Sequence, residues 1–195
     1  MAAVTAAMVK ELREMTGAGM MDCKKALAAT DGDMDAAVDF LREKGLAGAQ
    51  KKAGRIAAEG IVDVCVSDDA KKAVVLEVNA ETDFVAKNEK FRTYVGEVAA
   101  QALKTSAKTT EEFLNEKWEL DPSLTVAEKL SSMISIIGEN MTIRRFAKVE
   151  ENDGCVVSYI HAGGKIGVLV DVVSDVVNDD IKEMAKNVAM QVAAL

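Results

Sequence analysis

The chain has 195 residues, enough for one sizeable domain or two small ones, and its 49% hydrophobic and 29% charged content is that of an ordinary soluble globular protein. A net charge of −8 argues against nucleic acid as the main partner, because phosphate binding needs clustered Lys and Arg. Cys23, Cys65 and Cys155 form no CxxC pair, which argues against a disulfide framework and against a zinc site.

Charge is distributed unevenly along the chain. Residues 1–55 hold nine Lys/Arg and eight Asp/Glu, whereas the remainder holds fifteen and twenty-four. This asymmetry indicates two differently charged modules. The N-terminal residues reach a charge too early for a signal peptide, and no apolar run has the roughly 18 residues of a membrane helix. We therefore expect a cytoplasmic, reduced protein that makes no membrane contact.

Three short helices are predicted at the N-terminus. Thr5 can cap the first helix, which runs to about Met15 and is broken by TGAG (16–19). The segment MMDCKKALAAT follows as the second helix, and DMDAAVDFLREKG forms the third, with Gly45 as its C-cap. We predict a compact three-helix module over 1–55, joined to the rest by a Lys- and Ala-rich helical linker.

After the linker the hydrophobic period changes to two, which indicates strands. Strands are predicted at 61–67, 72–79, 141–150, 155–161 and 166–173, and helices at 88–103, 109–118, 125–140 and from the cap Asn178 onward. Gly163 and Gly164 form the tight turn between the last two strands. We place a first core half with a helical extension at 56–140 and a second half at 141–195.

An internal repeat relates the two halves. VLEV (75–78) matches LVDV (169–172), and VAAQ (98–101) matches VAMQ (188–191). Both copies are predicted to contain a hairpin, a loop and a helix. The loop is four residues longer in the first copy, and the excess falls on ETDFVAK (81–87). Surplus loop length with unusual side chains favours a functional role.

Two residues of this loop have a structural and a functional interpretation. Phe84 could pack on the following helix as a hydrophobic staple, the usual role of an aromatic residue there. Val85 is also available for that packing, which would leave Phe84 free to point outward. Asp83 could be an ordinary turn residue.

Similar alternatives apply to two other places. Met20 and Met21 could belong to the core of the helical module, but neighbours on a helix point about 100° apart, so we expect one to face outward. His161 is the single histidine and ends a strand, and a lone histidine is usually structural.

No catalytic motif is present. The sequence has no Walker loop, no GxSxG and no HExxH, and its acidic residues are scattered over predicted helix surfaces. We therefore do not expect an enzyme, and we expect no cofactor and no metal bound by this chain.

Two long motifs resemble bacterial elongation factor Ts, namely TGAGMMDCKKAL (16–27) and ETDFVAKNEKF (81–91). Three further stretches support the resemblance along the whole chain: KKAG (51–54), IGENMTIRRF (137–146) and SYIHAGGKIGVLV (158–170). The family is the nucleotide exchange factor of the GTPase elongation factor Tu. The resemblance implies an α+β fold, in which a three-helix module like ubiquitin-associated domains precedes a core of two similar halves, with antiparallel strands packed with helices.

The resemblance also implies which residues contact the GTPase. The N-terminal module would dock on the nucleotide-binding domain, and the TDFV stretch would reach towards the magnesium site. The implied contacts are Arg13, Met20, Met21 and Lys24 in the module, Thr82, Asp83, Phe84 and Val85 in the loop, and Ile137, Gly138 and His161 elsewhere in the core.

One departure concerns the end of the chain. Family members arranged this way continue into a projecting helical hairpin and a C-terminal segment, whereas this sequence ends in AMQVAAL without a capping signal. We therefore expect a truncated form. The family also allows a homodimer within the complex. Two functions stay open: an exchange factor that promotes GDP release, or a docking module that binds the GTPase without driving exchange.

Overall fold

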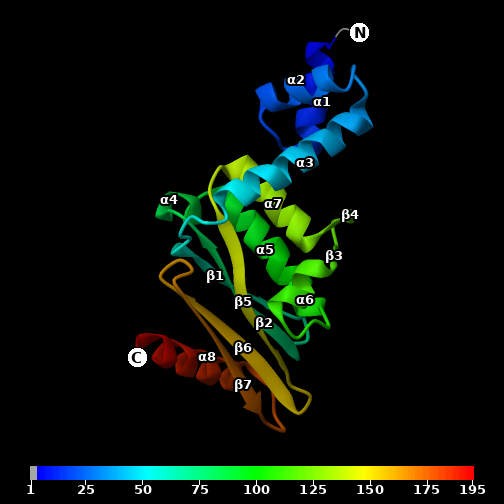
Figure 1. Cartoon of the computed structure of the whole chain (residues 1–195). Helices are drawn as coiled ribbons and strands as arrows, with labels where there is room; N and C mark the ends of the chain where they lie inside the picture. The colour runs from blue at the N-terminus through cyan, green and yellow to red at the C-terminus, as the bar shows by residue number, and fades with distance from the viewer. Residues whose placement is uncertain (1–3) are drawn as a thin grey trace. The chain divides into compact units, whose positions relative to one another are not determined.

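The computed structural model describes residues 4–195 and divides into two compact units (Figure 1). The helical unit comprises the chain up to Ile56 together with Ala127–Asn140, and the core unit comprises Ala57–Val126 and Met141–Leu195. The segment 127–140, which the sequence places in the first core half, thus groups with the N-terminal helices. Separate folding of the predicted domains stays a prediction.

The described part of the helical unit contains four helices: α1 (Ala6–Thr16), α2 (Met20–Ala29), α3 (Met34–Lys52) and α7 (Val126–Ile137). The hydroxyl of Thr5 accepts a hydrogen bond from the Met8 backbone N–H and begins α1, as predicted. Gly17 ends α1 with a φ of 67°, a conformation that costs glycine little. A small apolar core holds the N-terminal helices together, formed by Val9, Leu12, Cys23, Ala26, Leu27 and Ala37.

The prediction that Gly45 ends the third helix is wrong. Helix α3 continues to Lys52, and Gly45 is buried inside it. A Cβ at this position would lie 3.8 Å from the Cβ of Ser135 on α7, so this glycine sits where two helices approach each other. A glycine inside a helix costs only about 1 kcal/mol. The Ala- and Lys-rich residues that follow favour helix strongly enough to continue through it.

The core unit is built on antiparallel strands. Its three-stranded sheet has the order β1-β2-β5, with β1 at Glu59–Val66, β2 at Lys72–Ala80 and β5 at Met141–Glu150. Helix α5 (Glu89–Lys104) packs on β1 and β2. Its buried side chains include Phe91, Tyr94, Val95 and Val98. Strand β5, which the sequence places in the second half, thus pairs with β2 of the first half. The core unit also contains α6 (Thr110–Asn115), β3 (Lys117–Trp118) and β4 (Asp121–Thr125).

The second half repeats the order of a hairpin followed by a helix. Strands β6 (Gly154–His161) and β7 (Ile166–Val173) pair antiparallel, and α8 (Asp179–Ala194) packs on both. Gly163 and Gly164 have φ angles of 67° and 104° in the connecting turn, which confirms that prediction. The side chain of Asn178 caps α8, also as predicted.

The two copies differ in the connection between hairpin and helix. In the second copy residues 174–178 lead directly into α8, whereas in the first copy residues 81–88 contain a one-turn helix, α4 (Asp83–Ala86). The sequence predicts a plain loop here, so the helical turn is a correction. Within residues 4–195, no helix is both long and apolar enough to cross a membrane.

Candidate functional site

Helix α4 presents Phe84 to solvent. The Thr82 hydroxyl accepts a hydrogen bond from the Val85 backbone N–H at 3.4 Å, which caps the turn. Val85 is 8% exposed and Ala86 4%, so they anchor the turn in the core, whereas Phe84 is 81% exposed. Of the two interpretations of Phe84, the structure confirms the outward orientation. Its role in partner binding stays a prediction.

Asp83 is held in an ion pair on the same turn. Its Oδ2 lies 2.7 Å from Nζ of Lys87, four residues later. The hydrogen bond and charge of Lys87 hold the pKa of Asp83 below its ordinary value, and the charge of Lys165 acts in the same direction. Asp83 is therefore a carboxylate at neutral pH. The pair depends on the helical turn, because residues four apart lie on the same side of a helix.

The β6–β7 turn (161–165) lies beside this region of the core unit. The Val62 backbone N–H donates a hydrogen bond of 2.7 Å to the Gly164 carbonyl, which seats the turn on β1. His161 is exposed, and its Nδ1 lies 3.0 Å from the Tyr159 hydroxyl. Lys165 pairs with Glu59 at 2.7 Å.

Arg92 links α4 to this turn. Its Nε donates a hydrogen bond of 3.1 Å to the Ala86 carbonyl, and its Nη2 donates one of 2.8 Å to the Gly163 carbonyl. The structure thereby brings together two segments, TDFV and the one containing His161, that are about 80 residues apart in the sequence. Sequence reasoning missed Arg92, because no local spacing signals a hydrogen bond to a carbonyl 71 residues away.

The other predicted residues lie in the helical unit. Met20 and Met21 are 60% and 63% exposed, so both side chains face outward, whereas the helical spacing led us to expect this of one. Both begin α2, and the buried side of this helix starts only at Cys23. Arg13 and Lys24 are also exposed.

Ile137 and Gly138 end α7 in the same unit. Gly138 has a φ of 90°, and its N–H donates to the Ile134 carbonyl at 2.9 Å. Ile136 precedes these two residues, and its Cδ1 would lie 3.4 Å from a Cβ at Gly17, so the end of α7 lies near the α1–α2 turn. The predicted contacts are therefore divided between the two units.

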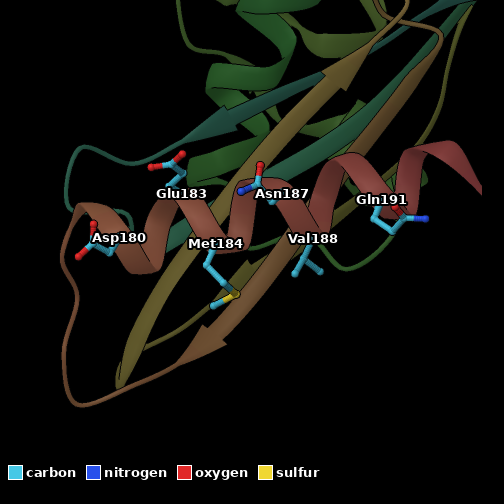
Figure 2. Close-up of a pocket in the computed structure, with 6 residues that line it drawn as sticks. All are labelled: Asp180, Glu183, Met184, Asn187, Val188 and Gln191. Atoms are coloured by element: carbon cyan, nitrogen blue, oxygen red, sulfur yellow. The ribbon is translucent and has the colours of Figure 1, made fainter.

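A shallow pocket lies elsewhere, on the outer side of α8 (Figure 2). Met184 and Val188 form its apolar part and are 46% and 43% exposed. All the residues that line it come from this one helix: Asp180, Glu183, Met184, Asn187, Val188 and Gln191. It contains none of the predicted contact residues.

Two family models match the chain. The model "Elongation factor TS" matches residues 81–195, and the model "UBA/TS-N domain" matches residues 4–41. The chain belongs to the elongation factor Ts family. The second match confirms the predicted ubiquitin-associated-like module, and the antiparallel core with its helices confirms the α+β fold.

Individual relatives agree with this assignment. Elongation factor Ts of Clostridium novyi is 56% identical over 191 residues, which cover 98% of this chain and 62% of the relative. The Clostridium tetani protein is 52% identical over 98% of this chain and 63% of its own length. The Halothermothrix orenii protein is 55% identical over 84% of this chain and 54% of its own length. The chain thus spans less than two thirds of the length of these members of the family.

Proposed function

We propose that this chain is a guanine nucleotide exchange factor for elongation factor Tu in protein synthesis. It binds the GDP-bound GTPase, disturbs its Mg²⁺ and phosphate site, and promotes GDP release so that GTP can bind. The observation that carries the proposal is Phe84, an aromatic side chain that is 81% exposed on a capped turn, in a chain of the elongation factor Ts family.

The proposed mechanism is differential binding rather than bond chemistry. A factor that binds the nucleotide-free GTPase more tightly than the GDP complex must weaken GDP binding by the same factor. Phe84 suits this role because an aromatic ring buries a large area and loses little entropy when it inserts between partner elements. Val85 and Ala86 are buried and anchor the turn that carries the ring.

Asp83 supports this step without holding the metal itself. A hard cation such as Mg²⁺ requires six oxygen ligands, and a single carboxylate paired with Lys87 is a poor cage for it. We propose that Asp83 competes for the partner groups that order the surroundings of the ion. Thr82 and Val85 act by fixing the geometry of the turn.

Further contacts complete the proposed complex. In the helical unit, Met20 and Met21 offer an adaptable apolar surface for the nucleotide-binding domain of the GTPase, flanked by the cations Arg13 and Lys24. Ile137 and Gly138, together with His161 of the core unit, form the remaining proposed contacts. Elongation factor Tu acts in the cytoplasm, so this is the proposed location, and a homodimer within the complex stays a proposal as well.

Stopped-flow fluorescence tests the function. Elongation factor Tu loaded with a fluorescent GDP is mixed with excess unlabelled GDP and increasing concentrations of this 195-residue chain. We expect the rate of GDP release to rise with chain concentration and to saturate. If the chain binds in a parallel calorimetric titration but leaves the release rate unchanged, it is the docking module and the exchange proposal is wrong.

A further inference from the structure

We propose that Arg92 is a positioning residue that fixes α4 and the β6–β7 turn as one rigid partner-binding surface. This inference rests on the proposed function, because it assigns Phe84 and His161 to one binding surface. Arg92 would not touch the partner's nucleotide site; it would act through the two segments that it joins.

The two acceptors of Arg92 explain why a guanidinium is suited to this place. The last carbonyls of a helix have no partner inside the helix, and the Ala86 carbonyl ends α4. The Gly163 carbonyl belongs to a tight turn. Nε and Nη2 of one planar fork reach these two acceptors at 3.1 Å and 2.8 Å. A single side chain therefore spans both segments, whereas a lysine would have to reach both carbonyls from one nitrogen on a flexible stem.

The position of Arg92 on its helix supports this interpretation. It lies in the first turns of α5, where the helix dipole disfavours a cation. The hydrogen bonds to two carbonyls offset that cost. The carboxylate of Asp63 on β1 also interacts with the guanidinium: burial raises the pKa of Asp63, and the charge of Arg92 opposes this rise.

The two segments that Arg92 joins also pack on the same strand, β1. Gly164 approaches β1 so closely that a Cβ there would lie 3.0 Å from the Cβ of Ile61. On the other side, α4 packs on β1 and β2. Phe84 and His161 thus belong to two segments that both pack on β1 and both accept a hydrogen bond from Arg92. A surface fixed before binding loses less entropy when the partner docks.

The first experiment uses the free chain. Amide hydrogen exchange is measured by NMR for the wild type, Arg92→Ala, Arg92→Lys and Lys90→Ala. Lys90 is an exposed cation on the same helix and serves as the matched control. We expect Arg92→Ala to accelerate exchange about 3- to 10-fold at Val62, Lys87 and Lys165, whose N–H groups bond within or to the linked segments. Arg92→Lys should restore little of this protection, and Lys90→Ala should match the wild type.

The second experiment measures coupling in the complex. GDP release is recorded for Phe84→Ala, His161→Ala and the double variant, each in the wild-type background and in the Arg92→Ala background. If Arg92 joins the two segments, the effects of the two substitutions are non-additive by about threefold or more in the wild-type background and become additive once the arginine is removed.

The outcomes separate this inference from the proposed function. Unchanged amide exchange in Arg92→Ala, full rescue by Arg92→Lys, or equal coupling in both backgrounds would overturn the positioning role. If the wild-type chain does not accelerate GDP release, the proposed function fails, and the amide-exchange experiment alone decides whether Arg92 fixes the two segments.

Discussion

Phe84 is a large apolar residue that the fold does not use. Its ring is 81% exposed although Val85, the next residue, is buried. Burial of Val85 supplies the packing that a hydrophobic staple would need, so no structural requirement explains a phenylalanine at this position. An exposed aromatic side chain at a fixed place is well suited to a partner contact.

We predict that Phe84→Ala changes the free energy of unfolding by less than about 0.5 kcal/mol, because an exposed side chain loses little packing. Most of the acceleration of GDP release should be lost. Chemical denaturation and stopped-flow release measure the two effects. Phe91→Ala serves as the control, because this fully buried ring should cost about 3 kcal/mol or more. A comparable cost for Phe84→Ala would show that the residue is structural.

Tyr94 is the opposite of Phe84, because it carries a polar group that is buried. Its side chain is 1% exposed, and its hydroxyl finds no hydrogen-bond partner among residues 4–195. Burial therefore raises the pKa of this hydroxyl strongly. A buried polar group without a partner costs about 1–3 kcal/mol.

We predict that Tyr94→Phe raises the free energy of unfolding by about 1 kcal/mol, because it removes the uncompensated hydroxyl while keeping the ring. Chemical denaturation measures the change. Tyr159→Phe removes a less buried hydroxyl and should shift stability by less than about 0.5 kcal/mol. A loss of stability in Tyr94→Phe would reveal an enclosed water that bonds to this hydroxyl.

At the scale of elements, much of the fold follows from local signals. Thr5 and Asn178 cap the helices that they are predicted to cap, and Gly163 and Gly164 form the predicted turn. These features depend on neighbouring residues and short-range geometry, so sequence spacing suffices to find them. The match between the two halves likewise exposed the longer connection that contains Phe84.

Features that depend on distant segments could not be predicted in this way. Gly45 has the local pattern of a helix end, but it packs on α7 at Ser135, which lies some 90 residues away in the sequence. The α4 turn is too short for a periodic signal. Arg92 looked like any exposed cation, because its role depends on where the Gly163 carbonyl lies after folding.

The cap of α4 gives a prediction at this scale. Thr82→Ala removes the acceptor for the Val85 N–H, and losing such a cap costs about 1 kcal/mol of local stability. We expect faster amide exchange at Val85 and a partial loss of GDP-release activity, smaller than that of Phe84→Ala. Thr82→Ser keeps the hydroxyl and should behave like the wild type. If Thr82→Ala retains full activity, the order of this turn is irrelevant to exchange.

At the scale of the whole molecule, the predicted contacts fall into two groups on two units. We predict that removing residues 1–55 weakens binding to elongation factor Tu about tenfold or more while the core still melts cooperatively. Calorimetric titration and circular dichroism measure the two properties. Some loss of stability is expected, because α7 loses the packing of α3 at Gly45.

The double variant Met20→Ala/Met21→Ala is the matched control for this deletion. Both side chains are exposed, so the variant should weaken binding without lowering the melting temperature. A deleted chain that aggregates or melts without cooperativity would show that the boundary after residue 55 is wrong.

We propose that α4 drives GDP release by disturbing the Mg²⁺ site of the GTPase. An ion that stabilises the GDP-bound state must oppose a factor that disfavours this state. Mg²⁺ is therefore expected to oppose the effect of Asp83 and Phe84 on GDP release, although neither residue binds the ion.

The decisive measurement is the rate of GDP release from elongation factor Tu over a range of free Mg²⁺ concentrations, with the wild-type chain, Asp83→Ala and Phe84→Ala. Stimulation by the wild type should fall as Mg²⁺ rises, and both variants should depend less on Mg²⁺. The same Mg²⁺ dependence in all three proteins would show that α4 does not act on the Mg²⁺ site and that exchange is driven by other contacts, such as those of Met20, Met21 or His161.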